Sequence, residues 1–360
     1  MAHRSGRKSG LFLRSVTVDA PEDLQSRSTA LKREWLIVLL PWTWFLVRSL
    51  HPLLDYVAIG LPVLIGAGIV LAAVVALLRR SAVAAWVGLS LVIFFIATVI
   101  APMRPASAAI PATTTRIATM NLGLYWFSDN DAGFFVFQEE PDILVGVELA
   151  ESHDEEFRER FVFAESDIIP LLTQQENQTG LSPVGETFRQ NGLPSIGVYS
   201  NVPMTVLDDP IENTFPGGLP GFRVQVEAED GPFILYAIHI PRPFPGEGPY
   251  QLPADQHVAL VDAVADAIEA EELPVLLAGD LNTVDRGQAY RRLTNVLRDG
   301  MRQSGWAVPT AERSLIRSAF FARLDHLLVT DELCVTNGAS FDTRYADHRP
   351  LVGDVGRCPN

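Results

Sequence analysis

Positive charge is scarce in most of this 360-residue sequence, and lysine occurs only at Lys8 and Lys32. Residues 111–360 carry 17 Arg against 38 Asp and Glu, a net charge of −21, whereas residues 1–110 carry 11 Lys and Arg against 5 acidic residues, a net +6. Nucleic-acid binding depends largely on Lys and Arg side chains that neutralise phosphates. We therefore expect no stable complex with a long nucleic acid.

Cysteine is also scarce, because Cys334 and Cys358 are the only two. Two cysteines are too few to form a zinc site by themselves. Cys334 begins one predicted strand, Cys334–Ala339, and Cys358 follows another, Leu351–Val355. If these strands pair antiparallel, the two cysteines lie side by side, and in an oxidising compartment we expect a disulfide, with two separate thiols as the alternative.

Charged residues are absent from two long apolar runs, Tyr56–Leu78 and Ser81–Met103, of 23 residues each. A membrane-spanning helix needs about 20 such residues. Buried core helices of this length would normally have a polar face, and these runs have none. The sequence therefore predicts two transmembrane helices.

A third apolar stretch, Trp35–Val47, has 13 residues and contains Pro41. It becomes long enough to span a membrane if it continues to Leu54, with Arg48 and His51 near the interface. An interfacial helix is the alternative, so we expect two to three spans.

The distribution of Lys and Arg in the short loops sets the orientation. Arg79 and Arg80 separate the two long runs, which places that loop in the cytoplasm and everything after Met103 outside it. A cleaved signal peptide fits poorly, because the apolar stretch is too long and begins too late. We expect a multi-pass protein of the cell membrane with an extracytoplasmic catalytic domain.

These features divide the chain into a basic cytoplasmic tail (1–34), a membrane region (35–103), a linker rich in Pro, Ala and Thr (104–115) and a folded domain (116–360). In the folded domain, short apolar strands alternate with polar helices, which predicts an α/β sandwich. The predicted helix is Val258–Glu269. The predicted strands are Arg116–Met120, Ile143–Val147, Ile196–Tyr199, Phe222–Val226, Phe233–Ile238, Pro274–Ala278, Leu324–Val329, Cys334–Ala339 and Leu351–Val355.

Many of these strands end at, or adjoin, a carboxylate, an Asn or a His, and scaffolds commonly present catalytic groups at strand ends. Alone, each such residue is ordinary: Asn121 suits a turn, and Glu148 suits the start of a solvated helix. Together they suit phosphate-ester hydrolysis. The residues in question are Asn121, Glu148, His239, Asp280, Asn282, Asp325, Asp347 and His348.

The chemistry assigns these residue types to distinct tasks. Mg²⁺ or Mn²⁺ prefers the carboxylate and amide oxygens that Glu148, Asp347, Asp280 and Asn121 provide. A water nucleophile needs a base near neutral pH, and His348 oriented by Asp325 is the candidate pair. The transition state gathers negative charge, which donors such as His239 and Asn282 offset.

The ordered motifs Met-Asn-Leu-Gly (120–123), a strand ending in Glu148, Ile-His239, Gly-Asp-Leu-Asn (279–282), Leu-Asp-His (324–326) and Asp-His-Arg-Pro (347–350) resemble the endonuclease/exonuclease/phosphatase family. The resemblance covers roughly residues 115–356 and extends to a membrane-anchored bacterial branch. It implies a four-layer fold of two β-sheets flanked by helices. It also implies a divalent-metal-dependent hydrolase of phosphate esters.

The resemblance further implies individual roles. Asn121 and Glu148 would lie at the metal, with Glu148 a direct ligand, and Asp347 would lie at the metal or beside the nucleophile. Asp280 and Asn282 would position the water and the phosphate, and His239 would contact the phosphate or act as the acid. His348, held by Asp325, would act on the nucleophile or the phosphate, whereas His326 is interpreted as structural.

Two positions depart from the family pattern, with Met120 where Trp is frequent and Val147 where Gln is frequent. Both changes are conservative for the chemistry. The segments Pro241–Gln256 and Thr173–Leu193 are expected to be loops, the first bordering the cleft. A zinc hydrolase is disfavoured, since the expected ligands are oxygens.

Family resemblance leaves the substrate open. A cleft held near a bilayer and the −21 charge favour a lipid head group or another small phosphodiester. An extracytoplasmic nuclease is the first alternative. A non-catalytic membrane receptor with the same fold is the second, although it would predict the loss of site residues that are all present here.

Overall fold

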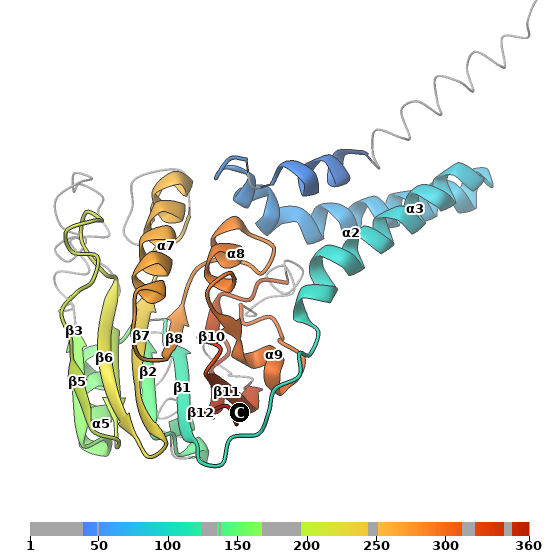
Figure 1. Cartoon of the computed structure of the whole chain (residues 1–360). Coiled ribbons are helices and arrows are strands. Elements are labelled where there is room, and N and C mark those ends of the chain that lie inside the picture. Colours follow the sequence, from blue (N-terminus) through green and yellow to red (C-terminus); the bar gives the residue numbers. More distant parts are fainter. Residues whose placement is uncertain are drawn as a thin grey trace, which may run out of the picture.

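The computed structural model describes residues 39–48, 50–123, 135–136, 138–167, 196–243, 251–311, 321–341 and 348–359. Within these residues the chain forms two mixed β-sheets of six strands each (Figure 1). In spatial order, the first sheet contains β11 (Leu333–Ser340), β12 (Leu351–Arg357), β1 (Thr115–Asn121), β2 (Ile143–Val147), β4 (Ile196–Ser200) and β3 (Phe163–Asp167). The second contains β5 (Met204–Val206), β6 (Gly221–Ala228), β7 (Gly231–His239), β8 (Val275–Asp280), β10 (Asp325–Val329) and β9 (Arg298–Asp299).

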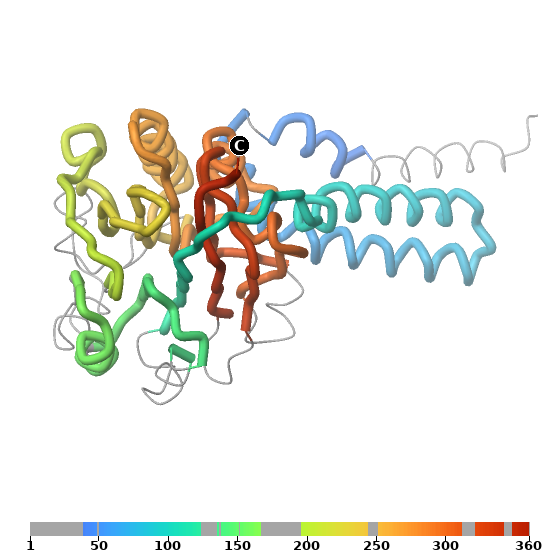
Figure 2. The backbone as a smooth tube through the Cα atoms, turned by 60° about the horizontal axis from the view of Figure 1, so that its bottom comes forward, coloured from blue at the N-terminus to red at the C-terminus, as the bar shows by residue number. Residues whose placement is uncertain are grey.

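Apolar side chains hold the layers together. Residues of both sheets, including Val145 and Leu276, form one core between them. The helices α7 (Ala254–Glu269) and α8 (Gln288–Thr294) cover the outer face of the second sheet, and α5 (Glu151–Arg160) covers that of the first. Figure 2 shows α5 and α7 on opposite sides of the strands. The predicted four-layer α/β sandwich is therefore confirmed.

The central strands are buried on both faces, which explains why they were recognisable in the sequence. All six residues of β8 are buried, and such strands appear as nearly continuous apolar runs. The sequence did not predict β3, β5 or β9. The edge strand β3 contains Glu165 and Ser166, and it lacks an apolar run because an edge can face solvent.

Two apolar helices precede the sandwich, α2 (Leu54–Arg79) and α3 (Ala82–Phe95). The chain continues helically after α3 through a π-helical turn, Ile96–Ile100, and a 3₁₀ turn, Ala101–Met103. Both helices are long and apolar enough to cross a membrane, and only 22% and 33% of their most apolar windows are buried. They are candidate membrane spans that match the predicted runs closely.

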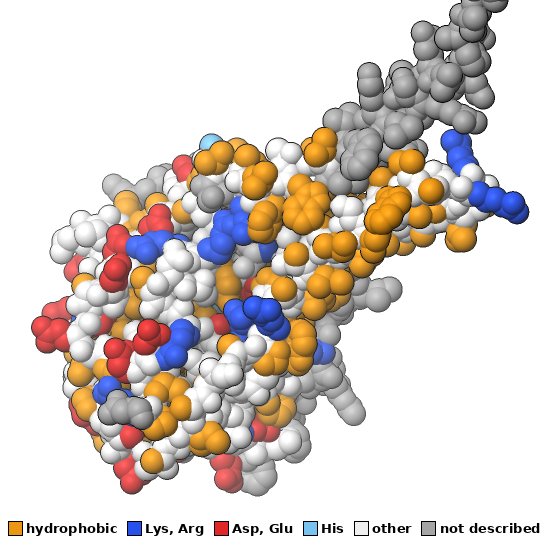
Figure 3. All heavy atoms as spheres, turned by 45° about the vertical axis from the view of Figure 1, so that its right-hand side comes forward, with side chains coloured by type: hydrophobic (Ala, Val, Ile, Leu, Met, Phe, Trp, Pro, Cys, Tyr) orange, Lys and Arg blue, Asp and Glu red, His pale blue; other side chains and the backbone are white. Residues whose placement is uncertain are grey.

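The helices α2 and α3 pack side by side and project from one side of the sandwich (Figures 1 and 2). The turn between them, which carries Arg79 and Arg80, lies at the end farthest from the sheets. Hydrophobic side chains dominate the surface of this pair, and basic side chains lie at its tip (Figure 3). The first residues of α2 and the end of the helical segment at Met103 are therefore both on the sandwich side.

The predicted third span is only partly described. Residues 39–47 form a helix, and residues 35–38 lie outside the described part. The Trp42 and Phe45 rings contact the Phe94 ring of α3, with centroids 4.9 and 6.2 Å apart. This packing fits either a third span or an interfacial helix.

The C-terminal strands carry the two cysteines. β11 and β12 pair antiparallel, and Cys334 lies opposite Gly356. Cys334 and Cys358 form a disulfide, the pairing expected from the sequence. The linker after Met103 lies beside α9 (Gly300–Ser304). There the N–H of Ala106 donates to the carbonyl of Arg302 at 2.6 Å.

Candidate active site

Neighbouring strand ends of the two sheets bring the candidate residues together. In the first sheet β1 and β2 run parallel, with Asn121 opposite Val147, so that Glu148 follows at the same edge. In the second sheet β7 and β8 also run parallel, with His239 opposite Asp280. The antiparallel strand β10 begins there too, with Asp325 opposite Asp280.

Asp280 lies at the centre of this group and connects the two sheets. Its Oδ2 accepts a 2.9 Å hydrogen bond from Asn121 Nδ2. The same oxygen lies 3.7 Å from His239 Nε2 and 3.7 Å from His348 Nδ1. Both Asn121 and Asp280 are 1% exposed, so their hydrogen bond joins the sheets in an environment from which water is largely excluded.

The Gly-Asp-Leu-Asn motif has a clear geometric basis. A Cβ at Gly279 would lie 1.9 Å from the carbonyl oxygen of Ile238, so only glycine fits there. Asn282 adopts a left-handed backbone with φ of 45°, and its N–H donates to Asp280 Oδ1 at 2.8 Å. Its Nδ2 donates to the carbonyl of Ile240 at 2.9 Å and lies 3.3 Å from His239 Nε2.

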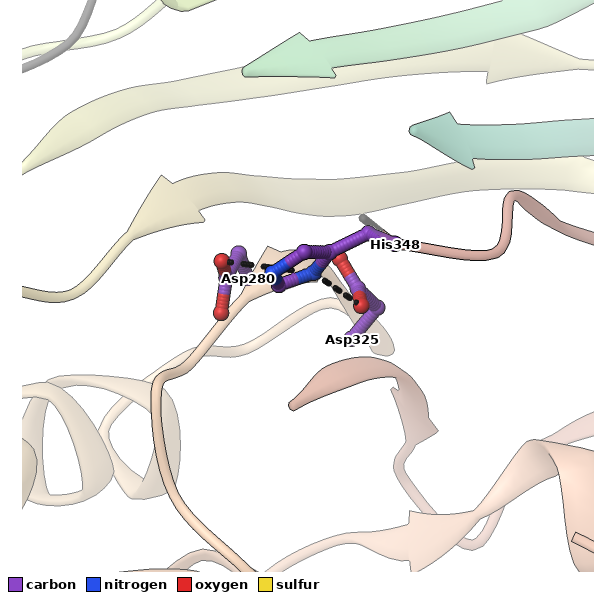
Figure 4. A group of neighbouring side chains, drawn as sticks. All are labelled: Asp280, Asp325 and His348. Carbon is purple, nitrogen blue, oxygen red and sulfur yellow. Dashed lines mark hydrogen bonds and ion pairs between the residues drawn. The ribbon is translucent and has the colours of Figure 1, made fainter. Parts of the chain in front are cut away.

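His348 and Asp325 form a buried pair, with Nδ1 2.7 Å from Oδ2 (Figure 4). Because a carboxylate only accepts hydrogen bonds, the Nδ1–H donates and Nε2 remains the basic nitrogen. Thr310 supports the pair, since its Oγ1 accepts from the N–H groups of Leu324 and Asp325 at 2.8 and 3.1 Å. The geometry is that of a histidine base held by an aspartate.

Burial controls the electrostatics of this site. It lowers the pKa of His239 to about 4, so this ring is neutral at physiological pH. Burial, with the nearby Asp325 carboxylate, raises the pKa of Asp280. Closely spaced buried carboxylates are costly unless positive charge compensates them.

The donor set fits a hard divalent cation. Asn121, Glu148 and Asp280 offer oxygen atoms at one edge of the sandwich, and the Glu148 backbone is left-handed, with φ of 55°. The ligand atoms of Asp280, Asp325 and His348 are also close enough to one another to hold a metal ion. We favour the Asn121, Glu148 and Asp280 side for the metal, because His348 Nδ1 is already bonded to Asp325. Asp347, a predicted ligand, lies outside the described residues.

His326 lies apart from this group in its contacts. The buried ring has Nε2 3.1 Å from the carbonyl oxygen of Arg323 and its centroid 5.2 Å from that of Tyr290. These contacts agree with the structural role expected from the sequence.

Two further residues, Arg242 and Thr310, lie at the site and were not predicted from the sequence. Arg242 lies two residues beyond Ile240, with one guanidinium nitrogen 3.5 Å from Glu148 Oε1 and 44% of its side chain exposed. Its position in the loop predicted to border the cleft was the available signal. Thr310 gave no signal, because its two hydrogen bonds to the 324–325 backbone form only in the folded chain.

A sequence profile described as the Endonuclease/Exonuclease/phosphatase family matches residues 125–348, more than half of the chain. The chain belongs to this family. Its members are metal-dependent phosphoesterases, and the protein is accordingly a metal-dependent hydrolase of phosphate ester bonds. The match includes seven of the eight candidate residues, and Asn121 lies just before it.

The solved structures to which this chain is similar are distant from it in sequence. An endonuclease/exonuclease/phosphatase from Beutenbergia cavernae is 20% identical, with 68% of this chain and 72% of that chain covered and a TM-score of 0.43. A Neisseria 3′ phosphatase bound to a product DNA hairpin is 14% identical (66% and 98% covered, TM-score 0.45). An AP endonuclease from Archaeoglobus fulgidus is 12% identical (66% and 98%, TM-score 0.47). A search of curated proteins found no match.

Proposed function

We propose that this protein is a membrane-anchored phosphodiesterase that hydrolyses a lipid head group or another small phosphodiester outside the cytoplasm. The observation that carries the proposal is the direct packing of the apolar helices on the segments that bear the active site. Ala58 and Phe94 of these helices share one apolar cluster with Val284, Ala311 and Ala322. An active site attached in this way to membrane helices would lie close to the lipid surface.

Each of the three sandwich residues is near a candidate catalytic group. Val284 follows Asn282 by two residues, and Ala322 precedes Asp325 by three. Ala311 forms an isolated β-bridge with His348. The ends of the helices that face the sandwich therefore support the three segments that supply Asn282, Asp325 and His348. This arrangement favours a substrate presented at the membrane.

The proposed roles follow from the contacts. His348, oriented by Asp325, takes the proton of the attacking water, and Asn282 with neutral His239 contributes polar contacts to the phosphoryl oxygens. Arg242 is exposed enough to reach a phosphate and charged enough to bind it. A divalent cation held by Glu148, Asp280 and Asn121 would stabilise the negative charge of the transition state.

The orientation is supported by the chain's charges. The turn between α2 and α3 carries Arg79 and Arg80, and both other helix ends face the sandwich. A basic short loop favours the cytoplasmic side. The sandwich then lies on the opposite side, where its disulfide can persist.

The test uses the full chain in nanodiscs with bis-p-nitrophenyl phosphate, sphingomyelin, phosphatidylinositol phosphates and plasmid DNA. Each substrate is offered with Mg²⁺, Mn²⁺ or EDTA, to the wild type and to Glu148→Ala, His348→Ala and the control Arg292→Ala. We expect metal-dependent turnover of a small phosphodiester or lipid that only the control retains. Preferred cleavage of DNA would replace the lipid proposal with a nuclease, and no turnover by folded protein would favour a receptor.

A further inference from the structure

Pro62 lies inside α2, where it leaves one backbone carbonyl without its helical donor. Proline lacks an N–H and its ring crowds the carbonyl four residues earlier, which here is that of Ala58. Arg286 of the sandwich supplies the missing donor: its Nε donates to Ala58 O, and a terminal nitrogen donates to Ile59 O at 3.2 Å. The Arg286 side chain is 3% exposed, so this contact is buried.

Asp55, in the first turn of α2, makes a second contact with the sandwich. Its carboxylate accepts from the N–H of Gln288 at 2.7 and 2.9 Å and from that of Ala289 at 3.4 Å. These are the first two residues of α8, whose own N-cap, Gly287, has no capping side chain. Asp55 therefore acts as the cap of α8 from 233 residues away.

These contacts fix one end of the loop that carries Asn282. The loop, residues 281–287, begins at Asp280 of β8 and ends at α8. Its first end is held by the sheet, and its second end is held by Asp55 and Arg286. Between them, Val284 is buried against the apolar helices, and its carbonyl accepts from the N–H of Gly287 at 2.7 Å.

Arg286 also reaches the segment before the catalytic aspartate. Its other terminal nitrogen donates to the carbonyl of Phe321 at 3.1 Å. The Phe321 ring contacts that of Phe95 in α3, with centroids 5.5 Å apart. One guanidinium thus joins α2, the 281–287 loop and the segment that leads into Asp325.

We propose that Asp55 and Arg286 are positioning residues. They hold the 281–287 loop and its Asn282 in the catalytic arrangement by docking the loop on the N-terminal end of α2, which faces the sandwich. This inference rests on the proposed hydrolytic function. It assigns the membrane helices a part in ordering the site in addition to anchoring. Asp55 is 7% and Arg286 3% exposed, and the contacts described above are with backbone groups, so both residues act through Asn282.

The test measures hydrogen exchange of residues 281–290 and steady-state hydrolysis of bis-p-nitrophenyl phosphate by the full chain in nanodiscs. In Asp55→Ala and Arg286→Ala we expect faster exchange in this segment and a loss of about tenfold or more in kcat, with KM changed less than about threefold. Arg286→Lys, which keeps one donor, should recover part of kcat. Arg292→Ala, which removes ion pairs of α8 with Asp262 and Asp266, is the matched control.

A loss of activity in the first two variants could also come from misfolding, and Pro62→Ala separates the two explanations. This variant restores a helical N–H and favours the helix. It gives Ala58 O an internal donor, so we expect weaker docking and an intermediate increase in exchange of residues 281–290. The inference would be overturned by unchanged exchange of residues 281–290 in Asp55→Ala, Arg286→Ala and Pro62→Ala. Faster exchange in Asp55→Ala and Arg286→Ala with kcat unchanged would also overturn it. If the wild type hydrolyses no substrate, the proposed function fails, and hydrogen exchange alone tests the docking: exchange of residues 281–290 equal to wild type in Asp55→Ala and Arg286→Ala overturns the inference.

Discussion

His348 Nδ1 lies 2.7 Å from Asp325 Oδ2, and this contact joins the start of β10 to the second residue of the family motif at 347–350. The pair is buried, with Asp325 1% and His348 5% exposed. The carboxylate fixes the ring orientation and stabilises the imidazolium that forms when the ring takes a proton. Its contribution to catalysis can be measured directly.

Asp325→Asn should lower kcat by about 10²- to 10⁴-fold, because the amide cannot stabilise the protonated ring and favours the wrong tautomer. His348→Ala should cause a loss of similar size. Because the two residues act as a unit, the double variant should be little worse than His348→Ala alone. Multiplicative losses in the steady-state kinetics would show that the residues act separately.

Metal binding should stabilise the folded chain through Glu148. At a Mg²⁺ concentration about 100 times Kd, linkage adds about 2.7 kcal/mol to the free energy of unfolding, and EDTA should remove it. Glu148→Gln should lose most of this gain, whereas Glu165→Gln, at an exposed carboxylate of β3, should retain it. Thermal unfolding with and without Mg²⁺ measures the difference. An equal gain in both variants would place the metal away from Glu148.

Arg242→Ala should weaken substrate binding more than turnover. The guanidinium lies at the site beside Glu148, where it can make a charge-assisted contact with a phosphate. We expect KM to rise about tenfold and kcat to change less, with partial recovery in Arg242→Lys. Arg298→Ala, at a surface ion pair with Asp331, is the control. A KM unchanged from wild type would remove Arg242 from the phosphate site.

Stability should fall in acid partly because of His257. This ring of α7 is 1% exposed, and burial lowers its pKa to about 4, opposed by a smaller raising effect of a hydrogen bond with the backbone of Leu281. Above pH 6.5 it is neutral in both states. Between pH 6.5 and pH 4 the unfolded chain binds a proton that the folded chain excludes, so the free energy of unfolding decreases as pH falls.

His257→Leu removes this protonation. The wild type should lose about 3 kcal/mol more than the variant between pH 7 and pH 4, which urea unfolding at several pH values can measure. At pH 7 the two proteins should be closer in stability than at pH 4, since the ring is neutral there in both the folded and the unfolded chain. Parallel pH profiles would mean that the ring is protonated in the folded chain.

Loss of the Cys334–Cys358 disulfide should destabilise the sandwich. The bond closes a loop with a sequence separation of 24, for which chain entropy gives about 3 kcal/mol. Reductant should therefore lower the unfolding temperature of the wild type and leave that of the Cys334→Ser/Cys358→Ser variant unchanged. If reductant has no effect on the wild type, the bond contributes little to the folded state.

Local patterns were sufficient for much of the fold. The uncharged runs predicted α2 and α3 closely, because a span is recognised by length and apolarity alone. The buried strands β2 and β8 were recognisable as short apolar runs. Glu148 follows β2, and β8 ends at Asp280. The edge strand β3 was missed because partial exposure removes the apolar signal.

The sequence by itself determined which polar residues end the strands, and with them the family and its chemistry. Only the tertiary structure decided which of them meet, such as Asn121 with Asp280 across the two sheets, 159 residues apart. It alone joined Arg286 to the carbonyl of Ala58, a contact across 228 residues that depends on Pro62. Apolar periodicity and turn chemistry act over a few residues, whereas contacts of this kind arise from sheet pairing and from the packing of helices against the sandwich.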